Sequence, residues 1–589
     1  MSQTIEDYAL IADGATAALI GRDGSLDWLC WPRFDSEACF AKLLGHGEHG
    51  SWSIAPVEPA TVTRRYMTDT MVLQTEFETS TGAVNLVDFM PIGAAAPSVI
   101  RLLIGRRGSV TMRTALAPRF NYGALMPWIE PCDDGIVARA GANAVVLRAP
   151  VALATCPGGA SAEFTVGNGQ RLAFVLSFGA AHAPLPAPLD AQSALTDAIG
   201  YWQRWIERFN RPTHWPDAVR RSLLTLRALT YQPTGGLIAA PTTSLPEQAG
   251  GTSNWDYRYC WLRDSTFTLT ALLNAGYHDE AAAWRDWILR AIAAEPSKMQ
   301  IMYRVDGTRD VSEHTLGWLP GYHWSPPVRI GNVAAGQHQV DVYGEVIDAM
   351  ELATRAGIAQ SAHGKHVELG IIEHLERVWN TAGPGLWESR GEPRHYTYSR
   401  VMAWVGVDRF LRSAARHGHG DAQLLERLRG LRGQIHEQVC NEGYDSRLRR
   451  FVAHYGSQSL DASLLLLPLV GFLPVEDPRV ASTIAAIEQE LMQDGLVMRQ
   501  APAERPGQGA FLACTCWLAD CQRLQGRIEE ACASIERVLM VRNDVGLLAE
   551  EYDTGAHALC GNFPQAFSHL AVVNAALAVS GPMLQRGGG

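Results

Sequence analysis

Hydrophobic and polar positions follow two different patterns along the chain, and the change falls near residue 190. From residue 11 to about residue 185, apolar positions form short or alternating runs that are separated by turn residues. This pattern, without any long helical period, predicts antiparallel strands packed as a β-sandwich. The runs comprise residues 17–20, 26–31, 61–66, 71–79, 83–89, 98–105, 110–117, 135–139, 144–148 and 171–178.

A helical pattern replaces the alternation from about residue 215 onward. Apolar positions there recur every three or four residues, which predicts about twelve helices joined in places by tight glycine turns. Consecutive helical hairpins of this kind predict six pairs that close into a toroid, with inner helices surrounded by outer ones. The predicted helices comprise residues 217–231, 264–274, 279–294, 340–356, 361–380, 397–417, 421–440, 460–470, 477–493, 509–524, 527–541 and 563–580.

These patterns divide the chain into three predicted parts. Residues 1–190 form the β-sandwich, residues 191–214 a linker helix, and residues 215–585 the helical barrel. Three prolines within residues 184–188 mark the first boundary, because closely spaced prolines interrupt regular structure. We expect the long loops of the barrel to carry function, since loops on a rigid scaffold commonly do so. They comprise residues 235–264, 298–339, 381–397 and 543–562.

Composition and charge narrow the class of protein. The chain of 589 residues is too long for one ordinary core, and 47% hydrophobic with 19% charged residues is typical of globular enzymes. A net charge of −11 without a basic stripe argues against nucleic acid or an anionic membrane as a partner. The N-terminal residues lack a basic region followed by an apolar one, so we expect no signal peptide and a cytoplasmic location.

The eleven cysteines predict neither a disulfide framework nor a metal site. They are odd in number and scattered, and the one cluster, Cys514, Cys516 and Cys521, lies in a helical pattern without a nearby histidine. We therefore expect reduced, mostly buried thiols and no bound metal. The chain also has no phosphate-binding loop, dinucleotide fingerprint or HExxH run, so no organic cofactor is expected.

Residues 254–264 concentrate the side chains that a sugar-binding site needs. This stretch holds four aromatic residues, two arginines and two aspartates, and an apolar helical pattern follows it directly. Aromatic rings pack on the C–H face of a pyranose, while arginine and aspartate form directed hydrogen bonds with its hydroxyls. The alternative interpretation is a buried aromatic cluster with structural arginine–aspartate pairs.

Two carboxylate motifs far downstream favour catalysis. Glu388 follows Trp387 just before a predicted helix, and Glu550 and Glu551 precede another. Hydrolysis of an acetal needs one carboxyl group to protonate the leaving oxygen and a second to activate the nucleophile. Burial against Trp387 would raise the pKa of Glu388 and suit it to be the acid. A glutamate among other acids and open to solvent would stay ionised and act as the base. Each glutamate taken alone could instead be a solvated charge or a partner of a helix N-cap.

Taken together, these motifs resemble those of glycoside hydrolase family 15, the glucoamylase and trehalase group, including its trehalase-like N-terminal β-domain. The resemblance implies an N-terminal β-sandwich, a catalytic (α/α)6 barrel and hydrolysis with inversion. The matching blocks cover nearly the whole chain and comprise residues 23–28, 243–247, 254–264, 331–332, 337–345, 387–388, 550–553 and 561–569.

The resemblance also implies roles for individual residues. Glu388 matches the general acid of the family, and Glu550 matches its general base, with Glu551 as the alternative. The chain departs from the family at Trp324, where many relatives have a small residue, so the subsite for the leaving group is expected to be narrow. The residues expected to bind substrate are Trp261, Arg263, Asp264, Tyr259, Trp324, Trp387 and Arg390.

The function expected from the sequence is an inverting exo-acting α-glucoside hydrolase that releases β-glucose from the non-reducing end. We place α,α-trehalose first as substrate, and maltose, dextrins or isomalto-oligosaccharides as the alternative. A phosphorylase is disfavoured because the acidic residues 550–553 would repel phosphate. A non-catalytic carbohydrate-binding protein is disfavoured because both Glu388 and Glu550 are present. The histidines His314, His338 and His569 are expected to be core or supporting groups.

Overall fold

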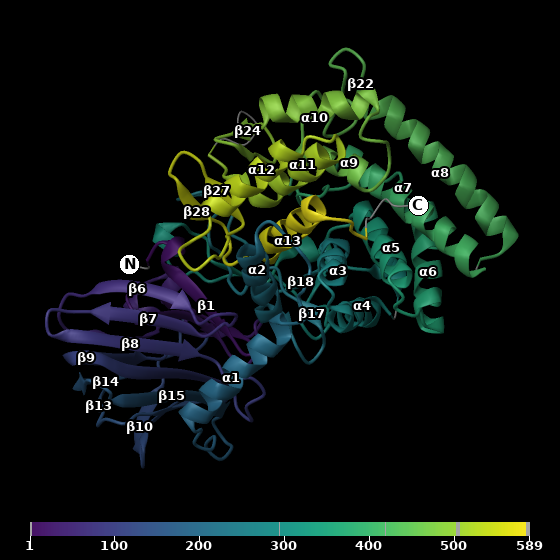
Figure 1. The fold of residues 1–589 in the computed structure, drawn as a ribbon. Coiled ribbons are helices and arrows are strands. Elements are labelled where there is room, and N and C mark those ends of the chain that lie inside the picture. The colour runs from purple at the N-terminus through teal and green to yellow at the C-terminus, as the bar shows by residue number, and fades with distance from the viewer. Residues whose placement is uncertain (1–2, 294, 419, 502–506, 585–589) are drawn as a thin grey trace.

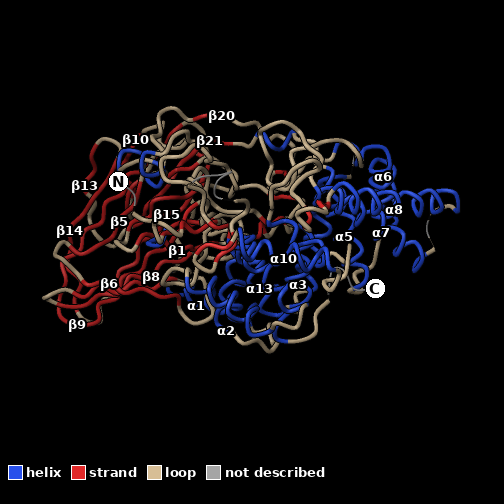
Figure 2. The backbone as a smooth tube through the Cα atoms, turned by 90° about the horizontal axis from the view of Figure 1, so that it is seen from above, coloured by secondary structure: helices blue, strands red, loops and turns tan. Residues whose placement is uncertain are grey.

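The protein has an N-terminal part built of strands and a C-terminal part built of helices (Figure 1). The computed structural model describes residues 3–293, 295–418, 420–501 and 507–584. Residues 294 and 585, where one helix and the barrel were expected to end, lie outside the described residues. A helix, α1 (Ala191–Ile206), connects the two parts, as Figure 2 shows from above. No helix of the described residues has the length and apolar character needed to cross a membrane.

The N-terminal strands form two antiparallel sheets that share one long strand. One sheet has the order β1-β2-β3-β5-β9-β14, and the other β6-β7-β8-β9-β15-β12-β11-β10. The expected β-sandwich is therefore confirmed. The strands are β1 (Tyr8–Ala12), β2 (Ala17–Gly21), β3 (Ser25–Cys30), β4 (Ala38–Phe40), β5 (Ser51–Pro56), β6 (Thr61–Tyr66), β7 (Leu73–Glu78), β8 (Gly82–Phe89), β9 (Ser98–Ala117), β10 (Trp128–Cys132), β11 (Gly135–Ala140), β12 (Asn143–Arg148), β13 (Ala154–Cys156), β14 (Gly159–Gly167) and β15 (Arg171–Ala180).

The shared strand β9 corrects one prediction. Residues 98–105 and 110–117 were expected to be separate strands, but they form one strand of 20 residues. Its first half pairs with β8 and β15, and its second half pairs with β5 and β14. Gly108, with φ of +62°, lies at the change of partners, next to a register shift in the pairing with β8. A glycine there lets the strand pass from one sheet to the other without a turn.

The C-terminal helices form a closed double ring. Each of α3, α5, α7, α9, α11 and α13 contacts the next in this order, and α13 contacts α3. The predicted toroid of six helix pairs is confirmed. The helices are α2 (Pro216–Ala228), α3 (Ser265–Asn274), α4 (His278–Ile292), α5 (Val340–Arg355), α6 (Ala362–Val378), α7 (Thr397–His417), α8 (Ala422–Glu442), α9 (Leu466–Leu469), α10 (Pro478–Glu490), α11 (Leu512–Leu524), α12 (Ile528–Met540) and α13 (Ala566–Ser580).

Burial separates the inner helices from the outer ones. Nearly every residue of α5 and α13 is buried, which is typical of a helix surrounded by protein on all sides. The outer helix α8 buries only one stripe, at Leu424, Leu428, Leu431, Ile435 and Val439. The apolar spacing therefore predicted the helices, while the breadth of the apolar surface distinguishes the two rings.

One predicted helix is much shorter than expected. Residues 460–470 form a 3-10 turn (Ala462–Leu465) followed by α9, which has only four residues. Pro468 lies within α9, and proline lacks the backbone N–H that a longer helix would use. The chain then turns at Gly471, whose φ is +75°.

Short two- and three-stranded sheets lie in the loops between helices. The loops that precede inner helices carry most of them, and β18 and β27 hold residues of the site described below. These strands are β16 (Thr230–Tyr231), β17 (Gly236–Leu237), β18 (Cys260–Trp261), β19 (Met302–Tyr303), β20 (His314–Thr315), β21 (Arg329–Ile330), β22 (Tyr444–Asp445), β23 (Arg450–Phe451), β24 (Met492–Gln493), β25 (Leu496–Val497), β26 (Ala510–Phe511), β27 (Glu551–Asp553) and β28 (Ala558–Cys560).

Candidate active site

A cavity of about 570 Å³, the central cavity, lies where the loops enter the inner helices. Five loops line it, and each leads from an outer helix into α3, α5, α7, α11 or α13. The floor includes Phe567 of α13 itself. The loop before α9 contributes indirectly, because Asp461 accepts hydrogen bonds from the indole Nε1 of Trp387 at 2.9 Å. Residues far apart in sequence therefore meet at one end of the barrel.

The sequence-predicted residues divide into two groups. Those that line the central cavity are Trp261, Arg263, Trp387, Glu388, Arg390 and Glu550. Those that do not are Tyr259, Asp264, Trp324 and Glu551. The first group includes a residue of each motif on which the expected chemistry depends, so the fold brings residues 261–263, 387–390 and 550 together.

Glu388 is held by two donors at the wall of the cavity. Trp261 Nε1 donates to Glu388 Oε1 at 2.7 Å, and Arg263 Nη1 donates to the same oxygen at 2.8 Å. Burial raises the pKa of Glu388 above its ordinary value, although the positive charge of Arg263 opposes this. The burial expected from the Trp387-Glu388 sequence is present, since the side chain of Glu388 is only 16% exposed.

The backbone at Glu388 is in an uncommon conformation. Its φ of +55° lies in the left-handed region, which residues other than glycine rarely adopt. The backbone N–H of Glu388 donates to the carbonyl of Gly385, and Gln337 Nε2 donates to the Glu388 carbonyl at 3.2 Å. These contacts hold the turn that directs the carboxyl group into the central cavity.

Arg263 and Asp264 form the base of this wall. Arg263 Nε donates to Asp264 Oδ1 at 2.9 Å, while its Nη1 reaches Glu388 and the carbonyl of Leu386. Asp264 is buried behind Arg263 and orients the guanidinium instead of reaching the cavity. Charged donors fixed in this way are suited to bind sugar hydroxyls with a defined direction.

Glu550 lies on a different loop of the same cavity. The Tyr257 hydroxyl donates to Glu550 Oε1 at 2.6 Å, and the backbone N–H of Asn562 donates to Oε2 at 3.4 Å. Burial, reinforced by the negative charge of Glu247, raises the pKa of Glu550 to about 7. The expectation that this glutamate is open to solvent was wrong, because it is only 1% exposed. Tyr257 and the backbone at residues 561–562 cover it.

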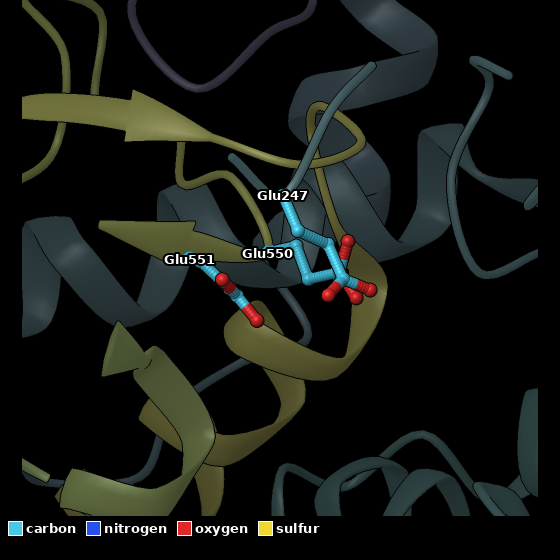
Figure 3. Close-up of side chains that lie close together, drawn as sticks. All are labelled: Glu247, Glu550 and Glu551. Carbon is cyan, nitrogen blue, oxygen red and sulfur yellow. The ribbon is translucent and has the colours of Figure 1, made fainter. Parts of the chain in front are cut away.

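A cluster of three glutamates surrounds the guanidinium of Arg499. One side-chain oxygen of each of Glu247, Glu550 and Glu551 lies within 4.8 Å of the other two (Figure 3). Arg499 Nη2 donates to Glu247 Oε2 at 2.6 Å and also pairs with Glu551 Oε1. Three carboxyl groups at this spacing have the donor set for a divalent cation, but Arg499 already supplies positive charge to two of them.

Glu247 and Glu551 have different positions in this cluster. Glu247 lines the central cavity, where its Oε1 accepts from Trp255 Nε1 at 3.0 Å and its Oε2 from Gln508 Nε2 at 2.7 Å. Glu551 is fully buried and accepts from the backbone N–H of Gly509 at 3.1 Å. In Figure 3 the carboxyl groups of Glu247 and Glu550 lie together, and that of Glu551 lies apart from them.

Tryptophan and arginine side chains stack at the rim of the cavity. The guanidinium carbons of Arg390 and Arg329 lie 4.0 Å and 4.7 Å from the ring centre of Trp255. Arg390 Nη2 also pairs with Glu313 Oε2 at 2.7 Å. These contacts hold Trp255 and Arg390 in place, so the rim presents an ordered aromatic and cationic surface.

Two predicted binding residues lie elsewhere. Tyr259 is buried beside a second cavity of about 600 Å³ between the β-sheets and the barrel, and its neighbour Trp261 lines the central one. The Trp324 side chain is 67% exposed and lines neither cavity. This position does not support the expected role of Trp324 in narrowing the leaving-group subsite.

The sequence did not indicate several residues of the site. Glu247, Arg499, Gln508 and Phe511 were absent from the expected set, although all four line the central cavity. Arg499 and Gln508 lie in the loop before α11, which carries no recognisable motif. A signal did exist for Glu247, because residues 243–247 form one of the blocks that resemble family 15.

The fold and the cavity together define a class of protein. A closed (α/α)6 barrel with an aromatic-lined cavity, and with buried carboxyl groups on separate loops, is the arrangement of a barrel glycoside hydrolase. Residues 215–577 match the family model described as glycosyl hydrolases family 15, and residues 1–166 match the one described as trehalase-like, N-terminal. The chain belongs to glycosyl hydrolase family 15 and is a glycoside hydrolase enzyme.

Several proteins are similar to the chain over nearly its whole length. A trehalase of Mycobacterium tuberculosis is 35% identical, covering 98% of this chain and 89% of that protein. A trehalase of Thermoplasma volcanium is 31% identical, covering 99% and 94%. An isomaltose glucohydrolase of Kribbella flavida is 27% identical, but over only 48% of this chain and 69% of that protein.

A solved structure has the same architecture. A bacterial glucoamylase in complex with acarbose superposes with a TM-score of 0.72, covering 98% of this chain and 95% of that one. Its sequence identity is 12%, so the likeness concerns the fold. Both the β-domain and the barrel are included in the match, which supports the two-part architecture described above.

Proposed function

We propose that the protein is an inverting exo-α-glucosidase whose preferred substrate is α,α-trehalose. The observation that carries this proposal is the placement of Glu388 and Glu550 on different loops of the central cavity. An inverting hydrolase needs one carboxyl group on each side of the scissile bond, with room for a water molecule beside the base. The fold supplies two such groups with different hydrogen-bonding partners.

Glu388 acts as the general acid. Both of its side-chain donors, Trp261 and Arg263, bind Oε1, so Oε2 can carry the proton for the glycosidic oxygen. Burial raises the pKa of Glu388, and the carboxyl group therefore retains its proton at a higher pH than an exposed glutamate would. Donation of this proton lets the second glucose leave as a neutral alcohol.

Glu550 acts as the general base. A water molecule attacks the anomeric carbon, and its proton passes to the Glu550 carboxylate as the glycosidic bond breaks. The hydrogen bond from Tyr257 fixes Oε1 of this carboxylate. Because its pKa is raised to about 7, Glu550 is a stronger base than an exposed glutamate once it is ionised. Glu551 supports this arrangement through Arg499.

Trp261 and Arg263 hold the terminal glucose. The Trp261 ring and the Arg263 guanidinium line the central cavity beside the acid Glu388. Aromatic faces and a fixed guanidinium are suited to one pyranose ring, so the enzyme acts on chain ends. Trp255 and Arg390 at the rim would contact the sugar that leaves.

Similarity over the full length supports trehalose as the substrate. The trehalases of Mycobacterium tuberculosis and Thermoplasma volcanium cover nearly all of this chain, including the N-terminal β-domain. The similarity to the isomaltose glucohydrolase supports isomaltose as the second candidate, although it covers about half of the chain.

A substrate panel tests the proposal. We expect the highest kcat/KM for trehalose when trehalose, maltose, isomaltose and soluble starch are compared at one pH. Inversion at one anomeric carbon of α,α-trehalose releases one β-glucose and one α-glucose, which NMR resolves before mutarotation. Initial release of α-glucose alone would refute inversion. Starch as the best substrate would refute the preference for a disaccharide.

A further inference from the structure

The N-terminal turn of the β-domain contacts the loop that carries Glu550. This turn comprises a 3-10 helix (Ile5–Asp7) and the start of β1, and the loop, residues 543–562, connects α12 with α13. The turn contacts β28 within this loop. Since Glu550 lies in the middle of the loop, contacts with both of its arms can determine where the carboxyl group lies.

Asn543 anchors the first arm of the loop. Its side-chain Nδ2 donates to the carbonyl oxygens of Glu6 at 3.1 Å and Tyr8 at 2.8 Å. Its Oδ1 accepts from the backbone N–H groups of Val545 at 3.2 Å and Leu547 at 2.9 Å. One buried amide thus joins the N-terminal turn to the chain that leads directly to Glu550.

Arg64 of β6 anchors the same arm through an ion pair. Its Nη2 lies 2.7 Å from Asp544 Oδ1, and its Nε donates to the Asp544 carboxylate at 3.0 Å and 3.1 Å. The same Nη2 donates to the Glu6 carbonyl at 2.8 Å, so Arg64 holds the turn and the loop together. The Arg64 side chain is fully buried and pairs with the Asp544 carboxylate in a bidentate manner, which fixes the direction of the guanidinium.

Glu6 anchors the second arm. Its side-chain Oε1 accepts a hydrogen bond from the backbone N–H of Leu559 in β28. Two residues further along, Gly561 and then Asn562 pack against the Glu550 carboxylate. The β-domain therefore holds the loop at residues 543–544 before Glu550 and at residue 559 after it.

We propose that Arg64 and the N-terminal turn position Glu550 for catalysis, so the β-domain sets the turnover rate of the barrel without touching substrate. This inference rests on the proposed role of Glu550 as the base. A general base works only within hydrogen-bond reach of its water, and a displacement of about 1 Å can cost about 100-fold in rate. The effect should therefore fall on kcat more than on KM.

Arg64→Ala and Arg220→Ala form a matched pair of variants. Arg220 of α2 pairs with Asp69 across the same domain interface, at 2.6 Å, and Asp69 follows β6 on the hairpin that carries Arg64. Among the described residues, Arg220 forms no hydrogen bond or ion pair with residues 543–562. We expect Arg64→Ala to lower kcat about 10- to 100-fold with KM changed less than about two-fold, and Arg220→Ala to retain kcat.

Glu6→Ala and Glu6→Gln test the second arm with a smaller change. Glutamine keeps a side-chain oxygen that can accept from Leu559, whereas alanine removes it. We expect Glu6→Ala to lower kcat and Glu6→Gln to restore most of it. Glu6→Ala also keeps the test open if Arg64→Ala fails to fold.

Hydrogen exchange of residues 543–562 provides the readout that does not depend on catalysis. We expect faster exchange in this loop for Arg64→Ala and Glu6→Ala, and unchanged exchange for Arg220→Ala. Faster exchange with unchanged kcat would overturn the positioning role, and an equal loss of kcat in Arg220→Ala would assign the effect to the interface as a whole. Full activity of Glu550→Gln would instead refute the assignment of Glu550 as the base. The hydrogen-exchange result for residues 543–562 would still stand in that case.

Discussion

Glu550 and Glu551 are consecutive in the chain, but only Glu550 lines the central cavity, while Glu551 pairs with Arg499 behind it. Glu551 begins β27, and successive side chains of an extended chain point to opposite sides. Glu550 therefore faces the central cavity, and Glu551 lies within the protein. The residue type alone does not separate the two roles, whereas the direction of each side chain does.

Glu550→Gln and Glu551→Gln should have different effects on the rate. We expect Glu550→Gln to lower kcat on the order of 10²–10⁴-fold, because the attacking water loses its proton acceptor. Glu551→Gln should cost less, since Glu551 does not line the central cavity. Steady-state kcat for trehalose measures both. An active Glu550→Gln variant beside an inactive Glu551→Gln variant would exchange the two roles.

Glu388→Gln should discriminate between leaving groups. The variant cannot protonate the glycosidic oxygen, so we expect a loss on the order of 10²–10⁴-fold with disaccharides. An aryl α-glucoside with an acidic phenol needs less protonation and should lose much less. Comparing kcat/KM for the two substrates in wild type and variant measures the difference. Similar losses with both substrates would contradict the assignment of the acid.

Glu247→Gln should move the pH optimum to lower values. The negative charge of Glu247 is, after burial, the main cause that raises the pKa of Glu550, so its removal lowers that pKa. The optimum of a bell-shaped profile lies midway between its two apparent pKa values, and therefore falls by half the change. A pH profile of kcat/KM checks this. An optimum that stays or rises would show that Glu247 does not act on Glu550 through its charge.

Gly561→Ala should impair catalysis while the barrel stays folded. A Cβ at Gly561 would lie 2.5 Å from Glu550 Oε2, and the φ of Gly561 is +75°. Either the base or the backbone must then move, so we expect kcat to fall by about 10- to 100-fold. Gly555→Ala in the same loop is the control, since its Cβ would approach only Asp553 Oδ1, at 3.4 Å. Equal activity of the two variants would contradict this reasoning.

His569 should make stability depend on pH below about 6.5. Its Nε2 accepts from the backbone N–H of Leu548 at 3.2 Å, and burial lowers its pKa to about 3. The unfolded chain binds a proton near pH 6.5 and the folded protein does not, so stability is lost as the pH falls from 6.5 toward 3. The slope is about 1.4 kcal/mol per pH unit for this residue. Denaturant unfolding of wild type and His569→Gln between pH 7 and pH 5 measures it, with a shallower slope expected for the variant.

Much of the architecture could be predicted from local periodicity. The helix at residues 397–417 was predicted to the residue, because apolar spacing and the following glycine define its length. The strand β9 was not, since Gly105 and Gly108 indicate a turn locally, and only pairing with β8 and β15 shows that the chain continues. Whether a strand continues past a glycine is decided by its tertiary contacts and not by the local sequence. The boundaries at residues 190 and 214 stay predictions.

The candidate site was predictable only where a motif marks it. Trp387-Glu388 and Glu550-Glu551 are recognisable because their chemistry needs those side chains in loops. The pair of Glu247 and Arg499 joins residues 252 positions apart, and Arg499 looks like an ordinary loop charge in sequence. No local pattern reports that two such charges are buried together, nor that Glu550 is shielded from solvent.

Contact between α13 and α3 completes the inner ring, and the loop before α13 carries Glu550. During synthesis on the ribosome, Glu388 and Arg263 emerge well before this loop. A chain that ends before residue 550 therefore lacks Glu550, Gln565 and Phe567 of the cavity lining. The central cavity is complete only when α13 has packed against α3, so activity would report a finished barrel.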